Sequence, residues 1–255
     1  MDDMPAPRLL ALGDCAWTVE FGHKICPEVH ARVIGMAKRL ATIRQNDPAW
    51  AAVCDVVPTF RSLTVHFAPL SADADALGQA LLALAQTISP QPALGVQGRF
   101  WHLPACFDAE FAPDLPSLAA AKGLRVDEVI DRLLQTVFRV YMIGFLPGFP
   151  YMGGLPTELA WPRRASPRPR VPAHSLAVAG EMCAVYPWDS PGGWHLLGRT
   201  PVPLFDLRHA DEPAMLRAGD RVRWYAIDRA DYERQFEQSQ RGEWQRESCL
   251  QPEAP

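Results

Sequence analysis

The chain has 255 residues, of which 48% are hydrophobic and 21% charged, and its formal net charge is −4. This length accommodates one large or two modest domains, and the composition is typical of a soluble globular protein. The small negative charge provides no general attraction for nucleic acid or for an anionic membrane surface, so we expect neither as a partner.

The N-terminus and the cysteines indicate a cytoplasmic protein. Residues 1–4 carry no Lys or Arg, and the apolar run 9–12 is too short for the core of a signal peptide. No segment approaches the roughly 20 apolar residues that span a bilayer. The six cysteines are scattered, with no C-x-x-C pair and no histidine at metal-ligand spacing beside them. We therefore expect reduced thiols and no metal site.

Residues 1–92 are predicted to form a small α/β domain. Its strands show short apolar runs or the alternation of apolar and polar residues that a half-buried strand requires. Its helices show apolar residues at helical spacing, and Pro27 is well placed to begin the first of them. The expected strands are 9–12, 16–21, 53–57 and 63–67, and the expected helices are 27–43 and 77–88. The break at Pro90-Gln91-Pro92 ends the domain.

Residues 93–228 are predicted to form a second domain that is rich in β-strands. Asp114 is the expected N-cap of a short helix that ends at Gly123, and a second helix follows over 126–136. The expected strands are 99–104, 137–143, 175–179, 183–186, 194–197 and 221–227. Many short strands with Gly and Pro between them favour a compact β-barrel or sandwich. Residues 229–255 are polar and predict a surface helix and a tail.

Two Pro/Gly-rich segments interrupt the second domain: residues 144–156 read GFLPGFPYMGGLP and residues 190–201 read SPGGWHLLGRTP. Because proline fixes its own φ and glycine reaches φ values closed to other residues, both segments predict irregular backbone. A plain connection between elements is one interpretation. The density of Pro and Gly, with aromatic residues among them, favours a rigid surface that binds a ligand or a partner.

Two motifs offer sites for an anion. Residues 162–170 carry four arginines on a segment that prolines keep extended, and a guanidinium suits carboxylate or phosphate; a solvated basic loop is the alternative. Gly192 and Gly193 can turn successive backbone N–H groups toward an anion, or they form a tight turn with Trp194 filling the end of a barrel.

Further candidates are less specific. His174 and His195 lie closest in sequence to these motifs, and each is either a general base or a packing residue. Arg199 and Asp206 are candidates for a buried structural pair. The sequence contains no Walker A, H-E-x-x-H, G-x-S-x-G or G-x-G-x-x-G motif, so motifs alone assign no nucleotide.

Three segments closely resemble the family of the B subunit of bacterial ATP-dependent 5-oxoprolinase. They are GFLPGFPYMGGLP (144–156), PRRASPRPRVPAHSLAVAG (162–180) and YPWDSPGGWHLLGRTPVPLFD (186–206). Weaker likeness extends the resemblance over most of residues 8–227. The family also includes the KipI-type inhibitor of a sporulation histidine kinase and the domain called allophanate hydrolase subunit 1, of the carboxyltransferase C/D type.

The resemblance implies an α+β fold in which a small N-terminal α/β domain precedes a cyclophilin-like β-barrel domain. It also implies that the chain acts with the C subunit of the oxoprolinase complex, using ATP and Mg²⁺, to phosphorylate 5-oxoproline, and that the A subunit completes ring opening to L-glutamate. ATP would supply the leaving group that the unreactive lactam lacks. On this view the chain is inactive alone.

The resemblance also implies site residues. Negative charge that develops in the reaction needs fixed cations and N–H donors, and positions in the three motifs match such groups. The catalytic candidates are Arg163, Arg168, Arg199 and His174. The candidates for contact with substrate, nucleotide or partner are Phe145, Pro147, Gly148, Phe149, Tyr151, Gly153, Gly154, Pro172, Ser175, Pro191, Gly192, Gly193 and Trp194.

The sequence departs from the family pattern at several positions. His174 stands at a usual glycine, Leu133 at a common histidine and Phe138 at a common tyrosine, and Met182-Cys183-Ala184 replaces Gln-Thr-Gly. These changes leave open whether activity is lost, redirected or retained. The alternatives are a module that binds and inhibits a sensor histidine kinase, another ATP-dependent amidohydrolase such as an allophanate hydrolase-like enzyme, and, by fold analogy alone, a peptidyl-prolyl isomerase.

Overall fold

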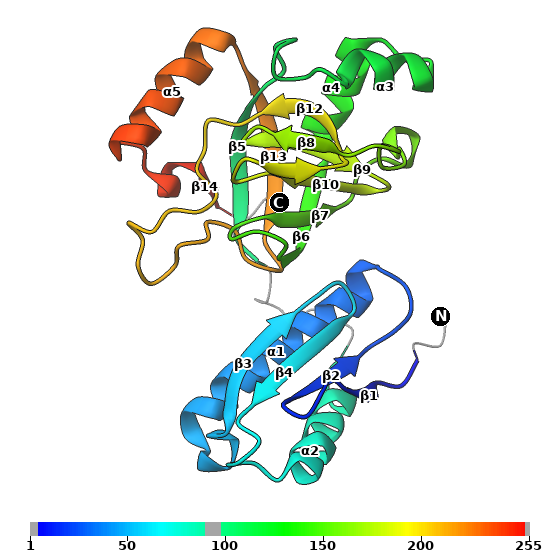
Figure 1. The fold of residues 1–255 in the computed structure, drawn as a ribbon, viewed down its shortest axis with the longest axis vertical. Coiled ribbons are helices and arrows are strands. Elements are labelled where there is room, and N and C mark those ends of the chain that lie inside the picture. The colour runs from blue at the N-terminus through cyan, green and yellow to red at the C-terminus, as the bar shows by residue number, and fades with distance from the viewer. Residues whose placement is uncertain (1–4, 90–97, 253–255) are drawn as a thin grey trace. The chain divides into compact units, whose positions relative to one another are not determined.

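The computed structural model describes residues 5–89 and 98–252, and the chain divides into two compact units, Met1–Gln97 and Gly98–Pro255 (Figure 1). The predicted domain break at 90–92 and the predicted start of the second domain at 93 lie outside the described residues, as do residues 1–4. Each unit has its own hydrophobic core. No helix in the described ranges is long and apolar enough to cross a membrane.

The first unit is an antiparallel sheet with two helices packed on one face. The sheet order is β1-β2-β4-β3, formed by β1 (Arg8–Ala11), β2 (Ala16–Glu20), β3 (Val53–Pro58) and β4 (Ser62–Phe67). Helix α1 (Pro27–Asn46) begins at the predicted proline, and α2 (Ala74–Gln86) is capped by the side chain of Asp73. The inward residues of the strands, such as Leu63, pack against Met36 of α1.

The second unit is a closed β-barrel. Its strands run in the order β12-β9-β10-β7-β6-β13-β5, and the pairing of β12 with β5 closes the ring. These strands are β5 (Phe100–Cys106), β6 (Val137–Ile143), β7 (Pro150–Gly153), β9 (Ser175–Ala179), β10 (Met182–Val185), β12 (His195–Arg199) and β13 (Arg221–Ile227). The predicted α+β class and cyclophilin-like barrel are therefore confirmed, and a sandwich is not formed.

Helices and short elements surround the barrel. They are α3 (Leu115–Lys122), α4 (Val126–Gln135), α5 (Arg229–Arg241), β14 (Leu250–Gln251), and the single-turn 3₁₀ helices η2 (Thr157–Leu159) and η3 (Arg246–Cys249), with η1 (Pro48–Trp50) in the first unit. Helix α3 ends at Gly123, whose φ of 64° is the left-handed cap that the sequence predicts. Strand β14 pairs with β5, so the segment after residue 228 is attached to the barrel sheet.

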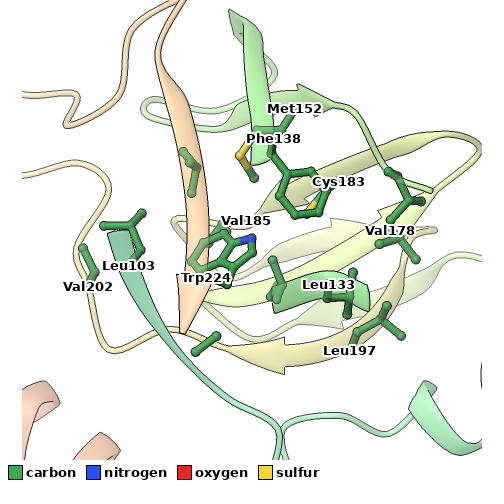
Figure 2. Close-up of a cluster of buried hydrophobic side chains, with 14 of the residues drawn as sticks. Leu103, Leu133, Phe138, Met152, Val178, Cys183, Val185, Leu197, Val202 and Trp224 are labelled. Atoms are coloured by element: carbon green, nitrogen blue, oxygen red, sulfur yellow. The ribbon is translucent and has the colours of Figure 1, made fainter. Parts of the chain in front are cut away.

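The interior of the barrel is filled by side chains from its own strands and from α4 (Figure 2). Leu133 of α4, Phe138 of β6 and Cys183 of β10 all lie in this core with no exposed surface. Burial raises the pKa of the Cys183 thiol, which stays protonated. Three of the positions that depart from the family pattern are therefore packing positions within the barrel.

Short strands lie inside the Pro/Gly-rich segments and at the end of the arginine-rich segment, where the sequence predicts no strand. Strand β7 lies within residues 144–156, and β8 (Arg168–Val171) pairs with β11 (Ser190–Gly192). Pro150 begins β7, and Pro191 lies in the two-stranded β8–β11 pair, where a missing N–H costs few ladder bonds. Gly153 of β7 lets Tyr141 pack closely, since a Cβ there would lie 2.2 Å from the tyrosine ring.

Candidate functional site

A cleft of about 220 Å³ lies where the two Pro/Gly-rich segments meet the arginine-rich segment 162–170. We call it the aromatic cleft. It is lined by Phe145, Phe149, Tyr151, Arg163, Pro167, Tyr186, Pro191, Gly192, Gly193 and Trp194. The sequence predicts all of these residues except Pro167 and Tyr186 as site candidates. The structure thus brings together side chains that come from three distant parts of the chain.

The floor of the aromatic cleft is a cluster of rings on the outer face of the barrel. Ala177 and Ala184 of β9 and β10 alternate with interior residues, and their small side chains leave room for the rings. The Phe149 ring meets Tyr186 edge-on at 5.1 Å and Trp194 edge-on at 6.1 Å between centroids. Trp194 therefore lies against the outside of the barrel, and the prediction that it fills the end of the barrel is wrong.

Gly192 permits this close packing. A Cβ at this position would lie 2.3 Å from the Tyr186 hydroxyl oxygen. The neighbouring Gly193 has no contact closer than 3.7 Å, and its carbonyl oxygen accepts the N–H of Arg164. Gly192 belongs to β11 and pairs with Arg168, so the glycine pair joins two short strands instead of forming a tight turn.

Arg163 is the one arginine of the segment 162–170 that has no carboxylate partner among residues 5–89 and 98–252. Its guanidinium lies over the Trp194 ring, 5.7 Å from the centroid, and its side chain is exposed. Arg170, by contrast, pairs with Asp189 at the surface. The aromatic cleft thus carries a cation that is free to meet an anionic ligand.

Asp114 binds the other two arginines of the segment. Its carboxylate accepts from Arg168 Nη2 at 2.6 Å, from Arg164 Nη1 at 3.4 Å and from the backbone N–H of Leu196 at 2.7 Å. The sequence predicts Asp114 as the N-cap of α3, but its side chain makes no capping bond. Sequence reasoning misses the ion pairs, because the only local signal is an excess of arginines without acidic residues nearby.

Two tyrosines, Tyr151 and Tyr186, are among the residues that line the aromatic cleft. Burial raises the pKa of Tyr151 and of Tyr186, and the positive charge of Arg163 opposes this only in part. The Tyr186 hydroxyl also receives a backbone hydrogen bond from Trp194. Both hydroxyls therefore remain protonated at neutral pH.

Two of the predicted catalytic residues, Arg199 and His174, lie away from the aromatic cleft. Arg199 stacks over Phe111 at 4.6 Å and hydrogen-bonds Tyr232. Asp206 instead pairs with Arg208, so the predicted Arg199–Asp206 pair is wrong.

His174 is partly buried beside Phe236 of α5, and its Nδ1 donates to the Val202 carbonyl at 3.0 Å. Burial lowers the pKa of His174. Its φ of 67° lies in the left-handed region, which suits the glycine usual at this position in the family.

His195 contacts the start of the arginine-rich segment through ring stacking and a hydrogen bond. Its ring stacks on Trp161 at 3.9 Å, and Nε2 donates to the carbonyl oxygen of Pro162 at 2.8 Å. The side chain is buried, so the packing interpretation of this histidine fits the structure better than that of an exposed general base. Among described residues no group of three His, Cys, Asp or Glu side chains is placed to hold a metal ion, and the six cysteines are free thiols.

The remaining predicted residues shape the loops instead of lining the aromatic cleft. The Pro147 carbonyl accepts the indole N–H of Trp188, and the Pro172 carbonyl accepts the hydroxyl of Ser175. Gly148 and Gly154 have φ of 79° and 101°, which residues with a side chain rarely adopt. With Gly153, they fix the path of the chain around the aromatic rings.

Comparison with known proteins places this architecture in a family. The family model described as carboxyltransferase domain, subdomain C and D, matches residues 7–216. The B subunit of 5-oxoprolinase from Bacillus subtilis is 34% identical over 242 residues, which is 89% of this chain and 96% of that protein.

Solved structures show the same fold. The structure of the protein TTHA0988 aligns with a TM-score of 0.70 at 32% identity, over 83% of this chain and 40% of that chain. The Kluyveromyces lactis urea carboxylase aligns with a TM-score of 0.74 at 18% identity, over 94% of this chain and 23% of that chain. This chain therefore spans less than half of each of these longer proteins. With a family model matched over most of its length and a B-subunit relative at 34% identity, the chain belongs to the carboxyltransferase C and D subdomain family and is a relative of the 5-oxoprolinase B subunits.

Proposed function

We propose that the chain is the B-type subunit of an ATP-dependent amidohydrolase and, specifically, of a 5-oxoprolinase in which it acts with the C-type and A-type subunits. The observation that carries the proposal is the aromatic cleft, in which the guanidinium of Arg163 lies over the Trp194 ring and has no carboxylate partner among the described residues. The name of the 34%-identical relative supports the same reading. The name of this relative also favours a component of an enzyme over a module that inhibits a sensor kinase.

The chemistry of 5-oxoproline matches the aromatic cleft. The molecule is a small flat lactam that bears a carboxylate. Arg163 can bind the carboxylate through its planar fork, and the exposed ring of Phe145, which also lines the cleft, offers an apolar face to the lactam ring. Each of these groups orients the substrate without covalent chemistry.

ATP is the second substrate and is bound by the complex as a whole, with Mg²⁺. In the phosphoryl transfer the lactam oxygen forms a bond to the γ-phosphorus while the bond to ADP breaks. Hydrolysis, assigned to the A-type subunit, then opens the C–N bond and releases phosphate and L-glutamate. Asp114 is paired with two arginines in this chain and is therefore not a candidate ligand for Mg²⁺. The contribution of this chain is to hold the lactam and to balance its charge.

The departures from the family pattern support retained activity. Leu133 and Phe138, which replace a histidine and a tyrosine, lie in the barrel core and do not line the aromatic cleft. Cys183 is in the same core. His174 occupies the left-handed backbone position of a glycine and does not line the aromatic cleft either. The residues that line the aromatic cleft are those of the family motifs.

Co-expression with candidate A-type and C-type subunits tests the proposal, with 5-oxoproline-dependent ATP hydrolysis as the measurement. We expect turnover that requires all three chains and that is absent when this chain is omitted. A stable complex without turnover on 5-oxoproline would contradict the assigned substrate. Failure to form any complex would contradict the assignment to a multi-subunit enzyme.

A further inference from the structure

The arginine-rich segment is held by one buried carboxylate. Asp114 has only 6% of its surface exposed, yet it meets three donors from two parts of the fold. Arg164 and Arg168 come from the segment itself, and the third donor is the backbone N–H of Leu196 in β12. A buried carboxylate with this many charged partners fixes their geometry, because any displacement leaves charge unpaired.

The connection from Asp114 to the aromatic cleft is short. Arg168, which Asp114 holds through Nη2, places its Nη1 3.4 Å from the carbonyl oxygen of Trp194. The backbone of Arg168 pairs with Gly192 in the β8–β11 ladder. Arg168 therefore links the buried carboxylate to two residues of the cleft wall, to Trp194 through its guanidinium and to Gly192 through its backbone.

Asp114 also divides the arginines of the segment into those that have a carboxylate partner and one that does not. Asp114 offsets Arg164 and Arg168 and holds both guanidinium groups toward itself. Arg163, the residue before them, has no such partner among the described residues and lines the aromatic cleft. While Asp114 holds Arg164 and Arg168, Arg163 is the one of these three guanidinium groups that a ligand carboxylate in the aromatic cleft meets.

We propose that Asp114 is a positioning residue: it anchors the segment 162–170 so that Arg163, and neither Arg164 nor Arg168, is presented to the anionic group of the substrate. The identity of the substrate in this inference rests on the proposed function, whereas the anchoring of the segment by Asp114 does not. Asp114 does not touch the ligand and acts through the two arginines. An anchored Arg163 is preorganised for the carboxylate, whereas a released segment must be ordered upon binding.

The first experiment uses the chain alone. Trypsin cuts after arginine, and the bonds after Arg163 and Arg164 lie in the anchored segment. We expect Asp114→Asn to accelerate cleavage at these bonds on the order of tenfold, because the Asn side chain keeps the shape but loses the ion pairs that close the segment. Cleavage after Arg241, at the end of α5, is the internal reference and stays unchanged.

Two further variants make this result specific. Asp206→Asn removes a comparable partly buried aspartate–arginine pair elsewhere in the second unit and should leave cleavage of the segment unchanged. Arg168→Gln breaks the same anchor from the other side and should reproduce the acceleration, which guards against misfolding of the Asp114 variant. Unchanged cleavage in both anchor variants would overturn the proposal.

The second experiment uses the reconstituted complex. We expect Asp114→Asn to raise the KM for 5-oxoproline about tenfold, because the ligand must order a released segment. A purely structural role would lower kcat through a smaller folded fraction and leave KM unchanged, and that result would overturn the proposal. If the wild-type complex shows no turnover while trypsin gives the expected pattern, the proposed function fails and the anchoring role stands.

Discussion

At the scale of single residues, the packing of the aromatic cleft requires a position that has no side chain. Gly192 makes room for the Tyr186 hydroxyl. Phe145 has a φ of 70°, unusual for a bulky residue, and it is 62% exposed at the cleft while its ring meets Phe149 edge-on. Strained backbone of this kind persists only where the surrounding structure holds it, and it is concentrated at functional sites.

Gly192→Ala tests this dependence. The new methyl group would overlap Tyr186, so we expect a loss of about 1–3 kcal/mol in the free energy of unfolding and reduced turnover of the complex. Gly193→Ala is the matched control, since its Cβ would meet nothing closer than 3.7 Å and should change stability by less than about 1 kcal/mol. Urea unfolding followed by fluorescence measures both. Equal stability of the two variants would refute the packing argument.

Sequence reasoning at this scale succeeds for the cleft lining and fails for its support. Pro, Gly and aromatic residues that lie close together in sequence signal a shaped surface by themselves, and seven of the ten lining residues belong to such segments, while Arg163 is predicted from the arginine-rich segment. Asp114 binds Arg168, which lies 54 residues away, and Tyr186 packs against Phe149, which precedes β7. No local pattern encodes such a pairing, and the predicted partner of Arg199 is wrong for the same reason.

At the scale of elements, periodicity predicts what is local. The amphipathic helices and the alternating strands lie where their patterns place them. Strands β7, β8 and β11 escape prediction, because each has only three or four residues and is defined by its pairing, β7 with β6 and β10 of the barrel, and β8 with β11. Helix α4 illustrates how an element outside the sheet still fills the barrel, with Leu133 directed into the core (Figure 2).

Leu133→Ala tests the role of α4 as part of the core. Its side chain is fully buried, so we expect a loss of about 2–5 kcal/mol in the free energy of unfolding from lost burial and the residual cavity. Val126→Ala at the start of the same helix alters a residue that is 39% exposed and should cost less than about 1 kcal/mol. Similar costs for the two variants, measured by urea unfolding, would contradict the assignment of Leu133 to the core.

At the scale of the whole molecule, the two units have separate cores. Val19 and Leu63 belong to the core of the first unit, and Trp224 and Leu103 belong to the core of the barrel. All residues that line the aromatic cleft lie in the second unit, Gly98–Pro255. The sequence predicts two domains from the Pro-rich break, since linkers have a compositional signature.

This division predicts that residues 98–255 fold alone. The barrel closes its own ring and buries its own core, so the fragment should unfold in one cooperative thermal transition with the circular dichroism of a β-rich protein. It should also keep the trypsin resistance of the segment 162–170, which Asp114 anchors from within the same unit. A fragment without a cooperative transition would show that the barrel needs the first unit.

The central claim is that Arg163 in the aromatic cleft binds the carboxylate of 5-oxoproline, and the most direct measurement is the KM of the reconstituted complex for 5-oxoproline. Arg163→Met should raise this KM about 10- to 100-fold, the range for loss of a charged hydrogen bond of roughly 1.5–3 kcal/mol. Arg170→Met removes an arginine of the same segment that is paired with Asp189 at the surface, and it should leave KM unchanged. A KM for Arg163→Met equal to that of Arg170→Met would contradict the account.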